Sequence, residues 1–107
     1  MKNHLIEFNK IEWINADVGI RYKAFTNGNQ RIRMAKFSEG FVEADWCSNG
    51  HIGYVLDGKF SIDFNGKAEY FKKGDTIYIP SGEADKHKAI LGKGEKVTIL
   101  LFEILEG

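Results

Sequence analysis

The chain has 107 residues, a length typical of one domain, and its 15 Lys and Arg residues balance its 15 Asp and Glu residues. A balanced charge gives no overall field that would attract nucleic acid or an anionic membrane, so we expect neither as a partner. Hydrophobic residues make up 43% of the sequence, which is enough to build a packed core and excludes an intrinsically disordered chain.

The N-terminal segment, up to Glu12, mixes charged and apolar residues and has no apolar stretch of signal-peptide length. The longest aliphatic run, residues 99–102, is followed by Glu103 and is much shorter than a membrane span. Cys47 is the only cysteine, which excludes an internal disulfide and suits a reducing compartment. We therefore expect a cytoplasmic protein in which Cys47 is available as a metal ligand or a reactive thiol.

Turn residues recur roughly every eight to twelve positions and separate short segments rich in β-branched and aromatic residues. This spacing predicts an all-β sandwich or barrel, and no segment has the apolar spacing and caps of a long helix. In chain order, the expected strands are residues 20–25, 30–37, 41–47, 54–56, 59–64, 67–71, 76–79, 87–90 and 97–105.

Two pairs of residues in this series are typical of tight β-hairpins. Asp57-Gly58 and Asn65-Gly66 tolerate the positive φ that both central residues of a type I′ turn require. They predict an antiparallel meander over residues 54–71. Pro80 cannot donate a hydrogen bond to a strand ladder, so it marks the end of the strand before it.

Two motifs resemble those of the cupin superfamily, and more closely its small single-domain (cupin 2 type) members. Residues 45–58 read D-W-C-S-N-G-H-I-G-Y-V-L-D-G and resemble the first motif, in which two histidines and a glutamate precede a strand and a glycine turn. Residues 74–87 read G-D-T-I-Y-I-P-S-G-E-A-D-K-H and resemble the second, Gly-x5-Pro-x-Gly followed by a histidine. The resemblance implies a jelly-roll barrel of antiparallel strands. We expect one cupin domain over residues 1–107, with a core barrel at roughly residues 19–105.

The aligned residues depart from the usual metal ligands of the family. When the first motif is aligned on its glycine turn, Asp45 and Cys47 fall at the two histidine positions and His51 falls at the glutamate position. In the second motif, Asp85 falls at the usual histidine position, and His87 follows two residues later. The usual set of three histidines and one carboxylate is therefore absent, and activities that depend on it are not implied.

The residues at these positions are nevertheless potential metal ligands. Asp45 and Cys47 are two residues apart on an expected strand, so their side chains share a face, and a turn after Cys47 can return His51 beside them. Asp85 and His87 are related by the same two-residue period. One sulfur and two nitrogens suit Zn²⁺, with Fe²⁺ or Ni²⁺ as alternatives. We predict that Cys47, His51 and His87 bind a divalent transition metal, with Asp45 or Asp85 as a fourth ligand.

Each of these residues also has an interpretation without a metal. Cys47 is consistent with a small buried hydrophobe, and His51 with a hydrogen-bonded histidine of the barrel. His87 lies between two lysines and is consistent with a surface position. Asp45 and Asp85 are equally consistent with solvated residues at strand ends.

Further polar residues are candidates for contact with a substrate. Arg31 and Arg33 share one face of an expected strand, and a cation inside a barrel, Arg33 in particular, would hold an anionic ligand such as a carboxylate. Solvated surface charges are an equally good interpretation. Glu43 continues the face of Asp45 and Cys47 by the same period, so it is a second candidate.

The leading hypothesis is a small metal-binding cupin that binds or acts on a small polar molecule in the barrel pocket. An open metal site allows isomerase, lyase, hydrolase or dioxygenase chemistry, and the sequence does not choose among them or establish that the protein is an enzyme. The alternative is a metal-free cupin that binds a sugar or carboxylate without turnover, and a third is a structural role in which the barrel only dimerises. We expect a homodimer, because an open jelly roll has sheet edges and the apolar residues Phe8, Ile11 and Trp13 precede the barrel.

Overall fold

The computed structural model describes residues 4–105, so the ends of the predicted domain, residues 1–3 and 106–107, lie outside the described residues. The described chain contains eight strands, two short 3₁₀ helices and no α-helix, and no helix in it is long and apolar enough to cross a membrane. The elements are η1 (Phe8–Lys10), β1 (Ile14–Asp17), β2 (Ile20–Asn27), β3 (Gln30–Ser38), β4 (His51–Phe64), β5 (Lys67–Lys72), β6 (Thr76–Ile79), η2 (Glu83–Asp85), β7 (Lys88–Ile90) and β8 (Lys96–Ile104).

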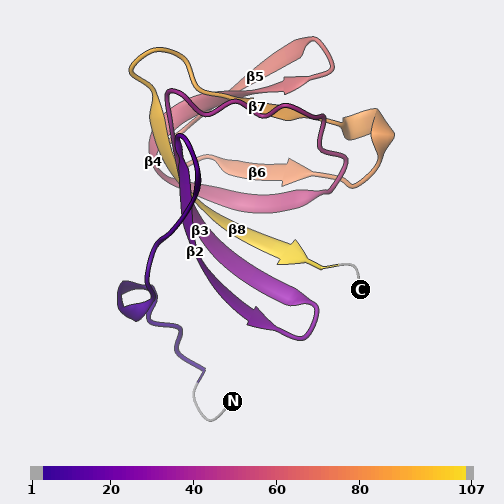
Figure 1. The fold of residues 1–107 in the computed structure, drawn as a ribbon. Coiled ribbons are helices and arrows are strands. Elements are labelled where there is room, and N and C mark those ends of the chain that lie inside the picture. The colour runs from indigo at the N-terminus through magenta and orange to yellow at the C-terminus, as the bar shows by residue number, and fades with distance from the viewer. Residues whose placement is uncertain (1–3, 106–107) are drawn as a thin grey trace.

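The strands form a curled half-barrel whose two layers are joined by the long strand β4 (Figure 1). The first half of β4 pairs with β8 on one side and β6 on the other, which gives a layer in the order β1-β2-β3-β8-β4-β6. The second half of β4 pairs with β5 and β7 in the other layer. Every one of these pairings is antiparallel, so the prediction of an all-β fold with antiparallel strands is confirmed.

The bend in β4 lies at Asp57 and Gly58, where the sequence predicted a hairpin. That prediction was wrong, because β4 passes through these residues without interruption. The register between β4 and β8 shifts between Val55 and Asp57, and Gly58 has a φ of 80°. An irregularity of this kind bends a strand and increases its twist. A Cβ atom on Gly58 would overlap the carbonyl oxygen of Lys96, so glycine is required where the strand passes from one layer to the other.

The second predicted hairpin is confirmed. Asn65 and Gly66 join β4 to β5 and have φ values of 55° and 101°, as a type I′ turn requires. The turn is closed by the backbone N–H of Gly66, which donates to Oδ1 of Asp63 at 2.6 Å.

The predicted strand at residues 41–47 was also wrong. Between β3 and β4 the backbone forms only one isolated bridge, from Cys47 to His87, and no ladder. Without a ladder, the two-residue alternation that placed Asp45 beside Cys47 is not imposed on the segment. The sequence also failed to indicate β1, whose residues Ile14–Asp17 are all exposed and show no alternation of burial.

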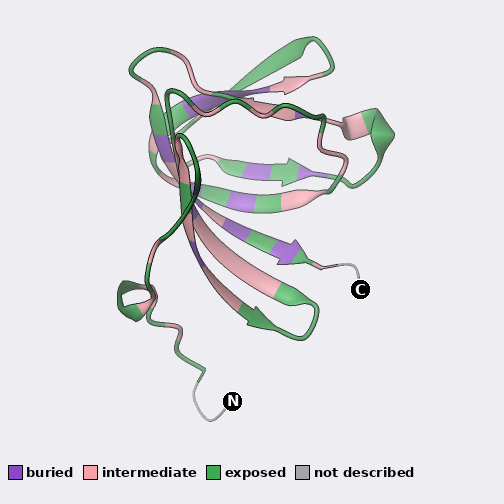
Figure 2. Cartoon of the chain, in the orientation of Figure 1, coloured by how far each residue is buried: buried purple, intermediate pink, exposed green. Residues whose placement is uncertain are grey.

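The core lies between the two layers, and along β6 and β8 buried side chains alternate with more exposed ones (Figure 2). This alternation is the period of a strand with one face on a core. The buried apolar residues are Ala35, Val55, Phe60, Ile62, Ile77, Ile79, Val97, Ile99 and Leu101.

Candidate functional site

Cys47 and His87 are held directly opposite each other by the isolated bridge. The N–H of each residue donates to the carbonyl oxygen of the other at 2.9 Å. Directly opposed residues of an antiparallel pair project their side chains to the same side. Both side chains therefore enter the space between the layers, and His87 is buried with 5% of its surface exposed.

His51 is the first residue of β4 and lies opposite Ile79 of β6. The turn before it is fixed by Gly50, whose N–H donates to Oγ of Ser81 at 2.8 Å. A Cβ atom on Gly50 would lie 2.6 Å from the carbonyl oxygen of Ile79, so this close approach requires glycine. The turn brings His51 back beside Cys47, which is four residues earlier.

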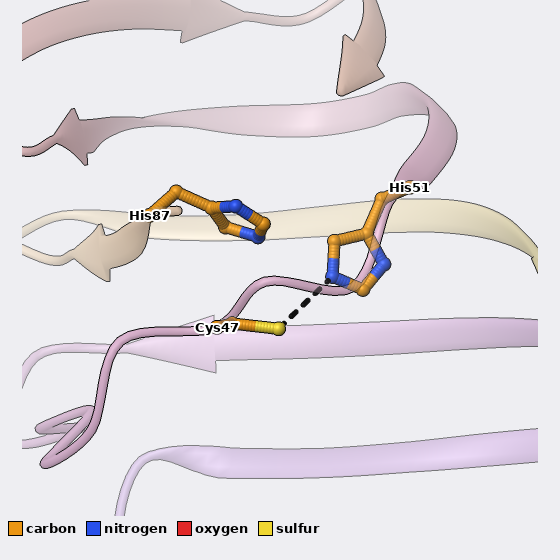
Figure 3. Close-up of side chains that lie close together, drawn as sticks. All are labelled: Cys47, His51 and His87. Atoms are coloured by element: carbon orange, nitrogen blue, oxygen red, sulfur yellow. Dashed lines mark hydrogen bonds between the residues drawn. The ribbon is translucent and has the colours of Figure 1, made fainter. Parts of the chain in front are cut away.

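The three side chains converge on one point (Figure 3). One donor atom from each of Cys47, His51 and His87 lies within 4.8 Å of the others, and Sγ of Cys47 is 3.8 Å from Nε2 of His51. In a tetrahedral site with Zn–S of about 2.3 Å and Zn–N of about 2.0–2.1 Å, sulfur and nitrogen are about 3.6 Å apart. The donor set and its spacing therefore fit a zinc ion after small side-chain adjustments.

The surroundings of each histidine also determine which of its ring nitrogens lacks a proton and can bind a metal. Nδ1 of His87 lies 3.0 Å from the carbonyl oxygen of Asp85, which can only accept, so Nδ1 carries the proton. Nδ1 of His51 faces the carboxylate of Glu103 at 3.4 Å, a long contact that lacks hydrogen-bond geometry, and it has no other partner among the described residues. A carboxylate behind Nδ1 favours the same tautomer. Nε2 of each ring is then left as an electron-pair donor.

Glu103 belongs to a polar row across the inner face of the sheet. Glu103 lies on β8 and pairs with two arginines of β3. Nε of Arg31 donates to Oε1 of Glu103 at 2.9 Å, and Nη2 of Arg33 donates to Oε2 at 2.9 Å. Burial would raise the pKa of Glu103, but the contact with His51 and the charges of Arg33 and Arg31 outweigh it and lower the pKa from 4.5 to about 2. The carboxylate is therefore ionised at neutral pH and forms ion pairs with both arginines.

The two aspartates lie outside the cluster. Among residues 4–105, the group of side chains that could hold a metal is Cys47, His51 and His87, without Asp45 or Asp85. Asp45 is exposed and lies in a segment that is not a strand. Asp85 lies in η2 and reaches His87 through its backbone carbonyl. Of the five predicted ligands, the structure brings three together.

Arg33 and Glu43, the predicted substrate contacts, both line the same cavity as the cluster. Each is already engaged by the protein. The guanidinium of Arg33 is paired with Glu103, although its Nε is buried without a partner in the described structure. Oε1 of Glu43 accepts a hydrogen bond from the backbone N–H of Ala89 at 2.8 Å and so ties the residue 39–50 segment to β7.

The cavity between the layers has a volume of about 530 Å³, within the usual range for small-molecule sites. Its polar end carries the cluster and the row of Glu103, and its remaining wall is built mainly from core side chains. Glu103 was not among the residues predicted from the sequence. One pattern in the sequence could have indicated it. Val97, Ile99 and Leu101 alternate along β8 as core residues do, and Glu103 is the next position of that series.

No family model matches the sequence, and no curated protein matches it. Solved structures do match the fold. The polyketide cyclase RemF from Streptomyces resistomycificus superposes with a TM-score of 0.78 at 17% identity, over 99% of this chain and 80% of that one. KdgF from Halomonas sp. gives 0.71 at 23%, over 92% and 90% of the two chains, and an RmlC-like cupin from Shewanella frigidimarina gives 0.70 at 18%, over 97% and 94%. Together with the half-barrel of antiparallel strands, these matches show that the chain has the fold of the small cupins.

Proposed function

We propose that the protein binds a divalent transition metal through Cys47, His51 and His87 and uses it to bind or transform a small molecule in the barrel cavity. The single observation that carries this proposal is the convergence of one sulfur and two imidazole donors within 4.8 Å on the wall of that cavity. Three protein ligands leave a fourth position open, which is the arrangement of catalytic rather than structural zinc sites.

Zinc suits this donor set best, because thiolate and imidazole are both common zinc ligands. Iron and nickel are the alternatives, since imidazole also suits them. When bound, such an ion would polarise a carbonyl group or activate a water molecule. The protein's own contribution is to hold the Nδ1 protons of His51 and His87 away from the centre, so that both Nε2 atoms can donate.

The test is a zinc titration of untagged, metal-free protein by calorimetry. We expect one ion per chain in the wild type. His51→Ala and His87→Ala should each abolish most of the uptake, because two remaining ligands hold the ion poorly. His4→Ala, at an exposed position outside the cavity, is the matched control and should bind like the wild type. Unchanged uptake in either cavity variant would contradict the proposal.

A metal-free cupin that binds a ligand without turnover is the second candidate. It is favoured by the ion pairs of Arg31 and Arg33 with Glu103, which form without a metal ion. In that case a small-molecule ligand would still bind after the protein is treated with a chelator. We further propose that Arg33 and Glu43 contact the ligand in either case, because both line the cavity.

We also propose that the protein is a homodimer, paired through the outer face of the larger layer. Ile52 on β4 lies opposite Phe102 on β8 and Tyr78 on β6, and the exposed Tyr54 continues the patch along β4. These four residues, whose exposed fractions run from 43% to 72%, offer about 400 Å² if a large residue presents about 200 Å² in full. The half-buried apolar residues beside them on β3 and β8 extend this toward the roughly 800 Å² per partner of a stable interface. The proposed interface is therefore this face, and not the N-terminal segment on which the sequence-based expectation rested.

Sedimentation equilibrium tests the pairing. Wild-type protein should have twice the mass of the chain, and Phe102→Glu should reduce it to one chain, because a carboxylate would be desolvated at the centre of the interface. Tyr70→Glu is the matched control, since Tyr70 is exposed on β5, away from this face. A monomeric wild type, or a dimer that Phe102→Glu leaves intact, would contradict the proposed interface.

We also propose a cytoplasmic location, because it follows from the proposed metal site. The site needs Cys47 as a reduced thiolate, and a reducing compartment maintains that state.

A further inference from the structure

We infer that the cavity takes an amphipathic organic anion: a small molecule with one anionic oxygen group at the metal cluster and an apolar body of ring size. This inference deepens the proposed function and rests on it, because the anionic preference depends on the bound metal. It also departs from the sequence-based expectation of a small polar molecule, since the wall of the cavity is not polar over most of its length.

The apolar part of the wall comes from both layers. Leu101 and Ile77 lie one two-residue step from the polar row on the inner face of β8 and β6. Ile62 and Ala89, which are directly paired, face them from the other layer, and Phe60 follows along β4. A polar body such as a sugar would lose its water against these side chains. The polar groups nearest to them, Arg33 and Glu43, already pair with Glu103 and with the backbone N–H of Ala89.

Most of the polar side chains of the cavity are gathered at one end. Arg31, Glu103 and His51 lie in one row across three adjacent strands, and Cys47 and His87 face that row. Because strands rise about 3.3–3.4 Å per residue, the next inward row lies roughly 7 Å away. Leu101 and Ile77 line that row, and the guanidinium of Arg33, which lies opposite Leu101 on β3, reaches back to Glu103. A ligand that spans the two regions therefore needs a polar head and an apolar body.

The charge of the polar end selects the head group. Arg31 and Arg33 are balanced by Glu103 and Glu43, which are the acidic side chains that line the cavity among the described residues. A divalent ion held by one thiolate and two neutral imidazoles leaves one net positive charge at the open coordination position. A carboxylate or an enolate would neutralise that charge and supply the oxygen donor.

Ala89 is the position at which this inference can be probed by a change of shape. Its methyl group lines the apolar wall, and its backbone N–H is held by Glu43. Isoleucine suits a strand and would occupy space that the apolar body of the ligand needs. Ala68, on the exposed strand β5, accepts the same substitution away from the cavity and provides a matched control.

The experiment is a calorimetric titration of zinc-loaded protein with three probes: 3-phenylpropanoate, glucuronate and 3-phenylpropan-1-ol. We expect 3-phenylpropanoate to bind at least tenfold more tightly than either of the others, because glucuronate lacks the apolar body and the alcohol lacks the charge. Ala89→Ile should weaken its binding at least tenfold, whereas Ala68→Ile should not. Thermal melts and zinc content of both variants are measured first, and the wild-type series alone decides the question if Ala89→Ile does not fold.

The outcomes separate this inference from the proposed metal site. Equal affinity for glucuronate, equal affinity for the alcohol, or no binding of any probe to zinc-loaded protein would overturn the inference while leaving the metal site intact. Absence of zinc uptake would overturn the metal site and, with it, the anionic preference. In that case the apolar part of the wall would be tested by titrating metal-free protein with the same probes. The two phenyl probes should still bind more tightly than glucuronate.

Discussion

Replacement of Glu103 by glutamine should weaken the fold through the polar row on the inner face. Glutamine keeps the shape of the side chain but removes the charge that pairs with Arg31 and Arg33. The pKa of Glu103 is lowered from 4.5 to about 2, and at about 1.36 kcal/mol per unit this corresponds to roughly 3 kcal/mol of stability at pH 7. Because the pKa in the folded state is the lower one, this stabilisation is present above the unfolded pKa and is lost as the pH falls toward 2. At pH 3.5 the same linkage leaves about 2 kcal/mol.

Urea unfolding of metal-free wild type and Glu103→Gln, at pH 7 and pH 3.5, measures both values. Urea is preferred to guanidinium because it does not screen ion pairs. Glu69→Gln, at an exposed position on β5, is the matched control and should change the free energy of unfolding by less than about 0.5 kcal/mol at either pH. A Glu103→Gln difference that is equally small, or one that grows as the pH falls, would refute the electrostatic argument.

Three further predictions concern the same elements. Glu103→Gln should weaken zinc binding by roughly 10–100-fold in the titration, because His51 loses the carboxylate that orients its ring, and an unchanged affinity would contradict that role. Gly58→Val should lower the free energy of unfolding by at least ~2 kcal/mol, and by more than Gly66→Val does. The reason is that a Cβ at Gly58 meets the carbonyl oxygen of Lys96, whereas one at Gly66 meets nothing within 4 Å. Equal losses of stability in thermal melts would argue against the irregularity that bends β4 at Gly58. Asp45→Asn and Asp85→Asn should each bind zinc within about twofold of the wild type, and a larger loss would return that aspartate to the ligand set.

The fold could be predicted from the sequence because its signals are local. The glycine turns, the isolated Pro80 and the short β-branched segments each depend on a few adjacent residues, and they gave an antiparallel barrel. The hairpin at Asp57-Gly58 was wrong because a positive φ at glycine serves a bulge as well as a turn. Only the pairing with β8, which is distant in the sequence, distinguishes the two.

The candidate site was predicted in part, and for a partly mistaken reason. Cys47, His51 and His87 do lie together, but Cys47 reaches the cavity through its bridge to His87 and not through a strand at residues 41–47. The same mistaken strand placed Asp45 beside them. Glu103 was missed because its role depends on Arg31, Arg33 and His51, which meet it only when β3, β8 and β4 are side by side.

The central claim, that Cys47 joins the two histidines as a metal ligand, is tested most directly by the absorption spectrum of protein loaded with one equivalent of Co²⁺. A thiolate bound to Co²⁺ gives an intense charge-transfer band in the near ultraviolet, and a four-coordinate site gives strong visible bands. We predict both features in the wild type, and in Cys47→Ser we predict loss of the near-ultraviolet band. A wild-type spectrum without the thiolate band, or a band that persists in Cys47→Ser, would contradict the account.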